Sequence, residues 1–510
     1  MSQRALRVSD RSRVQTRPQT ELLLEAQARR TPQHRQGPLA CLPAELLCEI
    51  ILHANLIHEE GTTVFEVMDY MKVCRRVYQV LKNSSALWTR VSMCVKTRED
   101  VAMLSKGIEY AVERSKSRPL AFSIGFDDAL VKEEDVVRVA GEVFKVGERW
   151  EEISVGFRLT CDVAHIQTWI SELSRLTSLA GSSPFTNVQS VALFREVTRS
   201  VVHDPALWPL KDIFPNAQLI QLEDIEFHSA HLLPAQLAIP TLEMLTMTVH
   251  RLRDVHSETS WVGDVLTHAP GLKELDVCVE LDVTHLPPGL TSPPSSSAPV
   301  ATGSGNSSIV PVSGGATPRS STPSPRVHTS LECLSLGQDR KWTVEEMRGW
   351  VYPALKRLEL LHHPFLTLED GAPGADIDIV GEILAMVQLS KCRLEYLDLR
   401  YMGLPNEELV RLLVALPDLK WVELYVAEEV DESLFTMLRE RSAGDEPVLP
   451  HLQCLGVRTC MWPMHGAKHT FDTQSFVDFV EDPRRMGDGP FAKLQGVCLM
   501  FDEEVKYSRS

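Results

Sequence analysis

The feature that most constrains the fold of this chain is a short apolar pattern that returns along much of its length. The pattern places apolar residues at positions i, i+3 and i+5, as in "PTLEMLTM", "PALKRLEL" and "PDLKWVEL". In six copies a proline stands two residues before the first apolar position, which exceeds what 31 prolines in 510 residues would give by chance. Copies of the pattern begin at Trp150, Val188, Ala217, Leu242, Leu272, Leu331, Leu355, Leu394, Leu419, Leu452 and Leu494.

Segments with helical apolar spacing lie between these copies, as in "DIVGEILAMVQLS" (378–390) and "NEELVRLLVAL" (406–416). A short strand followed by a helix, repeated every few tens of residues, is typical of a leucine-rich-repeat solenoid, in which each unit buries its apolar face against its neighbours. We therefore predict an α/β fold of short parallel strands plus helices, with irregular repeats. A doubly wound α/β sheet alternates in a similar way and stays open as the competing fold.

A separate helical unit precedes the repeats. After Pro43, the residues Leu46, Leu47, Ile50 and Ile51 follow helical spacing, and a second apolar stripe covers 64–81. The segment "NSSALWTRV" closes the unit with another apolar patch. We predict three short helices over 42–91. About 50 residues bury too little surface to be comfortably stable alone, so this unit should pack against something else.

The stretches "LPAELLCEIIL" and "VMDYMKVCRRVYQVLKNSSALWTRVSM" resemble an F-box in their Leu-Pro, Glu-Leu-Leu, Val-Cys-Arg-Arg and Leu-Trp features. The resemblance covers about a tenth of the chain. It implies an N-terminal three-helix F-box that docks on the Skp adaptor of an SCF-type cullin-RING ubiquitin ligase, followed by divergent leucine-rich repeats that hold a protein target. The residues that it implies for the adaptor contact, or for the helical core beneath it, are Leu42, Pro43, Leu46, Ile50, Cys74 and Trp88. A plain N-terminal cap for the solenoid is the alternative role.

The second predicted surface comes from strand geometry. If positions i, i+3 and i+5 face the core, then i+2, i+4 and i+6 project from the other face of each strand. The later copies place aromatic residues, arginines and acids at these positions, and these residue types dominate binding hot spots. Trp421 could instead be covered by a neighbouring loop. We predict that a protein target binds around Tyr396, Arg400, Trp421, Tyr425 and Arg458.

Composition shifts divide the chain. Residues 1–38 hold eight Arg and three acids and predict a disordered basic tail, with a transit peptide as the less favoured interpretation. The F-box is assigned to 39–95, and the two parts of the solenoid to 96–283 and 329–510. Between them, 284–328 is rich in Ser, Thr, Pro and Gly and predicts a disordered insert. The insert is either an inert spacer or a site of phosphorylation at Ser292, Thr317, Thr322 and Ser324, each of which precedes a proline.

Charge and cysteine content narrow the class of partner. The formal net charge of −17 disfavours nonspecific binding to nucleic acid or to an anionic membrane surface, so protein partners are expected. No apolar run predicts a membrane span or a signal peptide. The eleven cysteines form no C-x-x-C pair, and their odd number does not indicate a disulfide framework. We therefore predict a reduced, intracellular chain, cytoplasmic or nuclear.

The sequence lacks several common motifs of enzymatic chemistry. It has no Gly-Lys dipeptide for a P-loop, no H-E-x-x-H and no G-x-S-x-G, which favours a protein that is not an enzyme and needs no cofactor. Cys454, Cys460, His465 and His469 are a weak zinc candidate, with cysteines of the repeat core as the simpler account. His362 and His363 are expected in a solvated turn. The leading hypothesis is a ligase substrate receptor; a repeat scaffold without a ligase role and, last, a hydrolase remain the alternatives.

Overall fold

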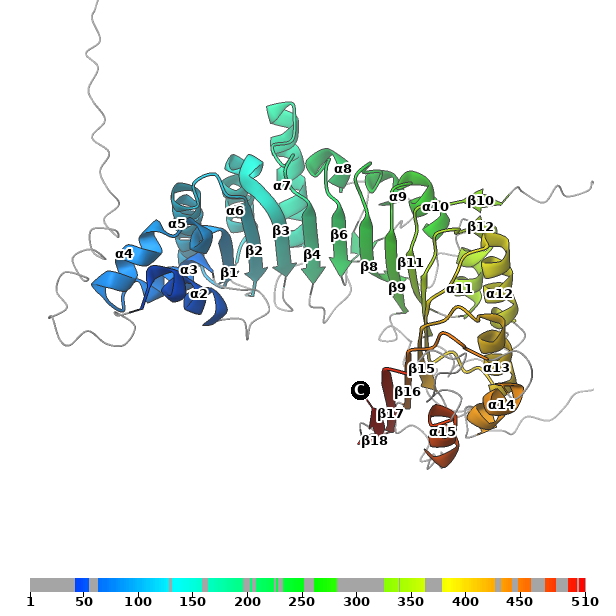
Figure 1. The fold of residues 1–510 in the computed structure, drawn as a ribbon. Helices are drawn as coiled ribbons and strands as arrows, with labels where there is room; N and C mark the ends of the chain where they lie inside the picture. The colour runs from blue at the N-terminus through cyan, green and yellow to red at the C-terminus, as the bar shows by residue number, and fades with distance from the viewer. Residues whose placement is uncertain are drawn as a thin grey trace, which may run out of the picture. The chain divides into compact units, whose positions relative to one another are not determined.

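The computed structural model describes most of the predicted helical unit and of the predicted repeats. The described residues are 42–54, 63–127, 131–157, 164–195, 202–203, 208–223, 226–227, 233–251, 261–281, 325–338, 340–362, 378–426, 433–442, 448–459, 473–482, 494–501 and 504–509. Contacts within the chain divide it into two units, Met1–Val191 and Ala192–Ser510 (Figure 1). The predicted basic tail at 1–38 lies outside the described residues.

The first unit begins with short helices and continues with alternating strands and helices. Its helices are α2 (Ala44–Ala54), α3 (Val64–Tyr70), α4 (Arg75–Asn83), the 3-10 turn η2 (Ser85–Trp88), α5 (Arg98–Arg114), α6 (Glu133–Lys145), the 3-10 turn η3 (Gly147–Arg149) and α7 (Ala164–Ala180). Its strands are β1 (Arg90–Val95), β2 (Leu120–Phe126) and β3 (Trp150–Phe157), and the boundary between the units falls within β4 (Ser190–Arg195).

Local sequence explains where two of these helices begin. Thr63 caps α3: its hydroxyl accepts from the Glu66 backbone N–H at 3.3 Å, and the Glu66 carboxylate accepts from the Thr63 N–H at 2.7 Å. Thr97 and Asp100 make the same reciprocal pair at the start of α5. Each pair satisfies two backbone donors that a helix start leaves without intrahelical partners. The interval 42–91 is helical as predicted, and α2 is its first helix. The second apolar stripe, 64–81, is divided between α3 and α4, and the closing segment forms only the 3-10 turn η2.

Parallel pairing in the first unit joins β1 to β2 and β2 to β3. The core between the strands and the helices is aromatic: the ring centroid of Phe122 lies 5.4 Å from that of Trp150 and 6.2 Å from that of Trp169. The indole N–H of Trp150 donates to the Val143 carbonyl oxygen at 2.9 Å, so its polar atom is satisfied although the side chain is buried.

The second unit repeats the same alternation. Its strands are β5 (Val202–His203), β6 (Leu219–Glu223), β7 (Glu226–Phe227), β8 (Met244–Arg251), β9 (Glu274–Leu281), β10 (Arg326–Val327), β11 (Cys333–Gln338), β12 (Trp350–Val351), β13 (Arg357–His362), β14 (Tyr396–Arg400), β15 (Trp421–Val426), β16 (Cys454–Thr459), β17 (Gly496–Phe501) and β18 (Glu504–Arg509). Its helices are α8 (Leu210–Ile213), α9 (Leu233–Gln236), α10 (Trp261–His268), α11 (Arg340–Met347), α12 (Ile379–Ser390), α13 (Asn406–Ala415), α14 (Ser433–Ser442) and α15 (Thr473–Val480).

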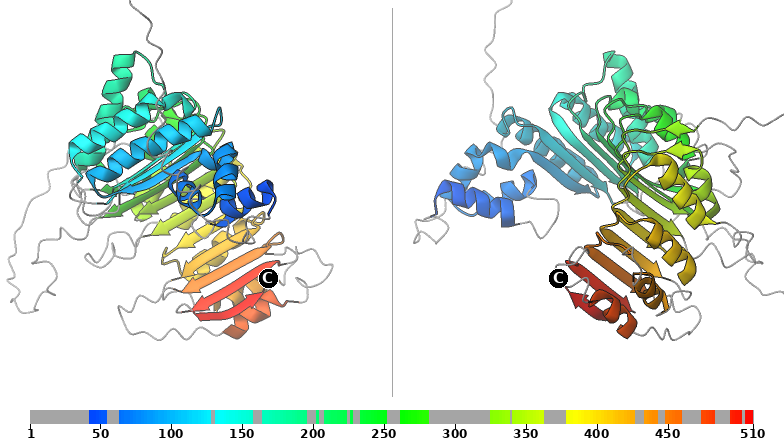
Figure 2. Two further views of the ribbon diagram at one scale, coloured as in Figure 1. Left: turned by 90° about the vertical axis from the view of Figure 1, so that its left-hand side faces the viewer. Right: turned by 45° about the vertical axis from the view of Figure 1, so that its right-hand side comes forward.

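The main sheet of this unit follows the order β6-β8-β9-β11-β13-β14-β15-β16-β17-β18. Its pairs from β6 to β17 are parallel, and the helices α10 to α14 line one face of the strands (Figure 2). The chain is thus an α/β protein with leucine-rich-repeat-like strand and helix repeats, as predicted. One departure is β18, which pairs antiparallel with β17.

The apolar pattern is confirmed at every copy. Each copy has a strand at its second and third apolar positions, and no apolar residue of the eleven copies is more than 5 % exposed. Burying a large aliphatic side chain contributes about 1.5–3 kcal/mol. The repeated triplet is therefore the main source of stability that the strands provide.

The prolines of the pattern have a common structural role. In each of the six copies that carry one, the N–H of the first apolar residue donates to the carbonyl of the residue before the proline. Examples are Leu242 to Ile239 at 3.1 Å and Leu419 to Leu416 at 3.4 Å. The proline is therefore the second residue of a four-residue turn, where its fixed φ is favourable. This turn leads the chain from the preceding segment into the strand.

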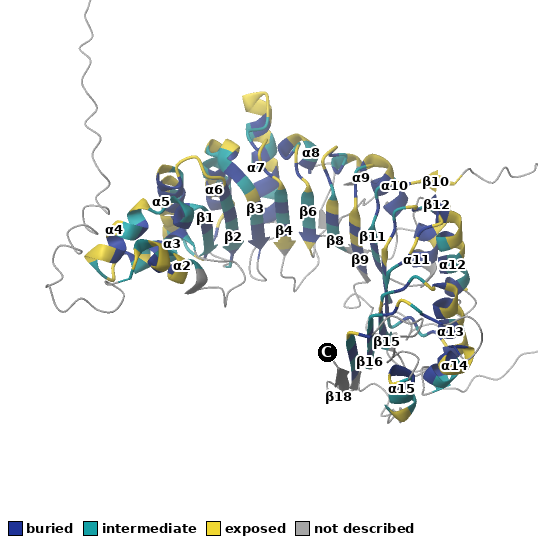
Figure 3. Cartoon of the chain, in the orientation of Figure 1, coloured by how far each residue is buried: buried dark blue, intermediate teal, exposed yellow. Residues whose placement is uncertain are grey.

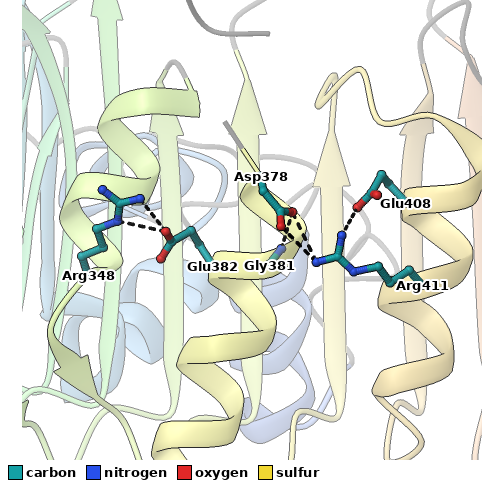
Figure 4. A network of polar contacts seen from close by, with 6 residues as sticks. All are labelled: Arg348, Asp378, Gly381, Glu382, Glu408 and Arg411. Carbon is teal, nitrogen blue, oxygen red and sulfur yellow. Dashed lines mark hydrogen bonds and ion pairs between the residues drawn. The ribbon is translucent and has the colours of Figure 1, made fainter. Parts of the chain in front are cut away.

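Polar contacts join neighbouring helices on the helical face (Figure 4). Asp378 caps α12 by accepting from the Gly381 N–H at 2.7 Å, and it also pairs with Arg411 of α13 at 3.1 Å. Glu382 of α12 accepts from Arg348, which follows α11. The pairs thus connect successive repeats. Because these groups are exposed, each pair contributes at most about 1 kcal/mol.

Three features of the fold differ from the sequence analysis. Strands β1 and β2 were missed, and β1 lies within the interval 39–95 that was assigned to the F-box. The interval 284–328 was predicted to be disordered, but its last residues form β10, which pairs with β12. There the buried His328 ring lies 3.1 Å from the Ala269 carbonyl oxygen, an anchor that the local composition does not indicate. The remainder of the interval, 284–324, lies outside the described residues.

Candidate functional site

The first candidate surface is the outer side of α2 in the first unit. Buried and exposed residues both occur along α2 (Figure 3). Leu47 and Ile51 are buried, whereas Leu46 and Ile50 are 51 % and 45 % exposed. Leu46 and Ile50 are four residues apart and therefore share one side of the helix. We call the surface formed by Leu42, Pro43, Leu46 and Ile50 the α2 face.

The start of α2 is held by its neighbours. The Leu47 N–H donates to the Pro43 carbonyl at 3.0 Å, and the guanidinium of Arg76 in α4 donates to the Leu42 carbonyl at 2.7 Å. Leu42 is partly exposed and Pro43 is exposed. Cys74 is partly buried and precedes the first residue of α4. These two hydrogen bonds fix the start of the helix, while the outer side of the helix remains exposed.

Trp88 lies in the core and not on the surface. Its indole N–H donates to the Leu81 carbonyl at 2.8 Å, and the Arg114 guanidinium lies 4.9 Å from its ring. Of the two roles that the sequence allowed for Trp88, the structure therefore assigns the helical core beneath the surface. Its polar atom is satisfied, as a buried indole requires.

The other helices of this group are anchored to the rest of their unit. Phe65 of α3 covers Gly107 of α5 so closely that a Cβ on Gly107 would lie 2.5 Å from the Phe65 ring. Trp88 of η2 packs beside Tyr110 of α5, with 6.4 Å between ring centroids. Thus α3 and η2 bury their apolar side chains within their own chain, whereas α2 leaves half of its apolar residues outside.

The second candidate surface is the side of β13, β14, β15 and β16 opposite the buried triplets, which we call the open face. The register aligns its side chains in three rows across the strands. The first row is Arg357, Tyr396, Trp421 and Cys454; the second is Glu359, Asp398, Glu423 and Gly456; the third is Leu361, Arg400, Tyr425 and Arg458.

The first row is a cation and aromatic stack. The Arg357 guanidinium lies 4.2 Å from the Tyr396 ring centroid, and the rings of Tyr396 and Trp421 are stacked at 5.9 Å. Trp421 is 41 % exposed, which resolves the earlier alternative that a loop covers it. Its indole N–H donates to Glu423 at 3.2 Å. The row presents a fixed aromatic surface to solvent.

The third row places Tyr425 between two arginines. The guanidinium of Arg400 is 5.0 Å from the Tyr425 ring centroid on one neighbouring strand, and that of Arg458 is 5.3 Å away on the other. Such cation–π contacts hold each side chain in one orientation. Tyr401, which follows β14 with φ of 57°, adds a ring 6.1 Å from Tyr425. Sequence analysis missed Tyr401 because it lies beyond the strand positions considered.

The second row is acidic and largely covered. Asp398 is 0 % exposed and accepts two hydrogen bonds from Arg400, at 2.7 and 3.0 Å. Glu359 pairs with Arg357, and burial, reinforced by the charge of Asp398, raises the pKa of Glu359. Pairing with Asp398 raises the pKa of Arg400, which therefore stays charged. The structure brings all five predicted target-binding residues together on neighbouring strands.

The structure describes one residue of each of two sequence predictions, the solvated turn at His362 and His363 and the weak zinc candidate that includes Cys454. His362 was expected in a solvated turn, but it is buried, and its Nδ1 lies 3.1 Å from the Tyr401 carbonyl oxygen; this expectation is wrong because the segment after β14 covers the end of β13. His363, Cys460, His465 and His469 lie outside the described residues. Cys454 is partly buried in the first row, and burial raises the pKa of its thiol. Within the described residues no three His, Cys, Asp or Glu side chains are grouped as metal ligands.

No protein-family model matches the chain, and no curated protein matches its sequence. A chain in the crystal structure of the Rad7 and Elc1 complex in yeast is similar at 13 % identity with a TM-score of 0.39, over 90 % of this chain and 94 % of that one. That likeness is too low to carry an argument about partners. Among the described helices, none is long and apolar enough to cross a membrane.

Proposed function

We propose that this chain is a substrate-recognition subunit of an SCF-type cullin-RING ubiquitin ligase. The α2 face docks on a Skp-type adaptor, and through it on the cullin, while the open face holds a protein target. The observation that carries the proposal is the exposure of Leu46 and Ile50 on a helix whose sequence resembles the start of an F-box. The chain itself performs no covalent step and needs no cofactor or metal, and it works in the cytoplasm or nucleus.

The energetics of α2 support a docking role. Burying a leucine or isoleucine side chain contributes about 1.5–3 kcal/mol, so two such residues left outside represent a substantial driving force for association. An amphipathic helix that lies in the groove of a partner uses this force with anchors at i and i+4. Leu46 and Ile50 have that spacing. Val73, which lies between α3 and α4, is also exposed.

The open face supports a role in target binding. Trp, Tyr and Arg are the residue types that most often dominate binding energy, and Tyr396, Arg400 and Trp421 are held by stacking and ion pairing before any partner arrives. Side chains already fixed lose little entropy on binding. Holding a target on the same assembly as the ubiquitin-carrying enzyme raises its effective concentration there.

Co-purification with a Skp-type adaptor tests the docking half of the proposal. Leu46→Asp with Ile50→Asp should reduce adaptor binding at least about tenfold, because two charges would enter an apolar interface. The matched control is Met103→Asp on α5, since Met103 is 46 % exposed and lies on another helix. Retained adaptor binding by the folded double variant would contradict the proposal.

Target capture tests the other half. Trp421→Ala with Tyr425→Ala should lose most proteins that the parent chain retains, whereas Met244→Ala on the strand face of β8 should retain them. Capture is compared by quantitative mass spectrometry on equal amounts of folded protein. Unchanged capture by the Trp421 and Tyr425 variant would rule out the open face as the target site.

The alternative is a repeat scaffold with no ligase role, in which the helical group only caps the first strands. The packing of Phe65 on Gly107 and of Trp88 beside Tyr110 favours this alternative, because it ties α3 and η2 to their own unit. The two candidates differ in one measurement. The parent protein binds a purified Skp-type adaptor under the first and does not bind it under the second.

A further inference from the structure

Arg458 differs from the other two arginines of the open face in its partners. Arg357 pairs with Glu359, and Arg400 pairs with Asp398. Arg458 forms no ion pair with a carboxylate of the described residues, and its buried Nε has no hydrogen-bond partner there. Its contact is with the Tyr425 ring. A partly buried guanidinium in this state has lost hydration without gaining a charge partner.

The sequence of β16 explains the difference. On β14 the acid Asp398 stands two residues before Arg400, and this spacing places both side chains on the same face of the strand. On β16 the residue two before Arg458 is Gly456. In the second row, β13, β14 and β15 carry acids in register, and Gly456 takes the fourth position. Strand β16 thus has an arginine at the position that Arg400 has on β14, but it lacks the acid that stands two residues before it on β14.

The backbone at Gly456 leaves room beside Arg458. The atoms nearest to a Cβ built there belong to the Glu423 side chain, and the closest lies at 3.4 Å, an ordinary van der Waals contact. Gly456 is not in the left-handed conformation that would require glycine. Neither sterics nor backbone conformation therefore accounts for glycine at this position.

We propose that Arg458, beside Tyr425, binds a carboxylate side chain supplied by the bound protein, a glutamate or aspartate in an extended segment. The proposal rests on the function proposed for the open face and names the chemistry that this face selects. The ligand carboxylate takes the role that Asp398 has for Arg400. A charge-assisted pair of this kind, formed where water is partly excluded, gives specificity as well as affinity.

The surrounding charges favour a carboxylate over a phosphate. Glu423 lies beside the same space, with a carboxylate oxygen 3.8 Å from the position of a Gly456 Cβ. Asp398 and Glu359 continue the acidic row behind it. A phosphate monoester carries about −1.5 to −2 charges at neutral pH and is repelled by these acids more strongly than a single carboxylate. One arginine without a carboxylate partner in the described part of the chain matches one negative charge.

The aromatic first row defines the rest of the ligand. Trp421 is four residues before Tyr425 on β15, so their Cα atoms are about 13 Å apart at a rise of about 3.3 Å per residue. A segment that pairs with Arg458 and also covers the exposed Trp421 ring must span at least about four extended residues. The site therefore selects an acidic residue with an apolar or aromatic residue about four positions away.

Oriented peptide pools provide the test. Four pools of twelve-residue peptides carry Glu, phosphoserine, Gln or Lys at one fixed central position, with phenylalanine fixed four residues on either side and the other positions degenerate. Binding to the full-length chain is measured by fluorescence anisotropy. The Glu pool should bind at least about fivefold more tightly than the Gln pool, and the phosphoserine pool more weakly than the Glu pool.

Three variants assign the preference to Arg458. Arg458→Gln should remove the difference between the Glu and Gln pools, and Arg458→Glu should shift the preference to the Lys pool. Gly456→Asp should also remove it while keeping the arginine, because the new acid pairs with Arg458 as Asp398 pairs with Arg400. Arg439→Gln is the control, since Arg439 pairs with Asp478 on α14 and α15, away from the strands.

Several outcomes would overturn this inference. They are equal binding of the Glu and Gln pools, tightest binding of the phosphoserine pool, no measurable binding of any pool, or a Glu preference that survives Gly456→Asp in a folded protein. None of these affects adaptor binding through the α2 face. The proposed function fails on the Leu46 and Ile50 variants, and the carboxylate site fails on the Arg458 and Gly456 variants, so the two failures are distinguishable.

Discussion

Two pairs of strands, β8 with β9 and β14 with β15, bury the same kind of apolar triplet. They differ in the side chains on the opposite side of the sheet. In both pairs the triplet residues are buried, as Leu275 and Leu397 illustrate. The opposite side of β8 and β9 carries Met244, Thr246, Glu274 and Asp276 in register. The opposite side of β14 and β15 carries Tyr396, Arg400, Trp421 and Tyr425, joined by stacking and cation–π contacts.

The difference separates stability from recognition. The alternating directions of strand side chains let one face keep a constant apolar pattern while the other changes without altering the fold. The two pairs of strands therefore share their packing requirement, and under the proposed function the aromatic and arginine rows serve target binding. The following predictions test this separation, beginning with the largest expected effect.

Truncating a buried leucine should lower the free energy of unfolding by a similar amount in both regions. Leu275→Ala on β9 and Leu397→Ala on β14 should each lower the free energy of unfolding by about 2–5 kcal/mol, because both remove fully buried methyl groups. Urea unfolding followed by circular dichroism gives the two values. A cost at Leu397 more than twice that at Leu275 would show that the two cores are not equivalent.

Removing an acidic side chain should affect the free energy of unfolding differently in the two regions. Asp398→Asn leaves Arg400 without its ion pair and should lower the free energy of unfolding by about 1–3 kcal/mol, since Asp398 is fully buried. Asp276→Asn on β9 should change it by less than about 0.5 kcal/mol, because Asp276 is exposed. Equal effects in urea unfolding would mean that the buried pair has no structural role.

The aromatic row should matter little for stability. Trp421→Ala should lower the free energy of unfolding by about 0.5–1.5 kcal/mol through its lost stacking on Tyr396. Met244→Ala, at an exposed position on β8, should remain within about 0.5 kcal/mol of the parent. A loss at Trp421 as large as that at Leu397 would place Trp421 among the core residues and remove the distinction between the faces.

The smallest effect concerns pH. Burial raises the pKa of Glu359, so the folded state binds this proton more tightly than the unfolded chain, and stability should fall as pH rises from the ordinary value of 4.5 through the raised value. Glu359→Gln should remove this trend. The hydrogen bond from Lys356 lowers the pKa of Glu332 on the preceding repeat. Glu332 should therefore lose its stabilising contribution as pH falls below 4.5, and Glu332→Gln should remove that loss. Thermal unfolding between pH 3 and 7 measures both.

Some elements could be predicted from the sequence because their signals are local. Segments 378–390 and 406–416 form α12 and α13 nearly as expected, since their apolar spacing is helical. Strand β2 was missed although Pro119, Ala121, Ile124 and Phe126 follow the spacing of the repeat, and its residues Leu120, Phe122, Ile124 and Phe126 alternate. Strand β1 was missed because it directly follows the helical unit, without a turn signal of its own.

The candidate sites show the same division. Spacing alone placed the five target-binding candidates on one side of neighbouring strands, and the register confirms that placement. Spacing could not tell that Trp88 is buried while Leu46 is exposed, because both belong to apolar stripes of short helices. It also could not tell that Arg400 has a charge partner and that Arg458 has none among the described residues.

The sequence by itself determined the repeat, because the alternation of buried and open positions is a property of each strand and needs no distant contact. Only the tertiary structure decided which side chains meet across strands, which apolar residues remain outside, and which charge is left without a partner. These outcomes depend on the register between segments far apart in the chain. No local spacing encodes that register.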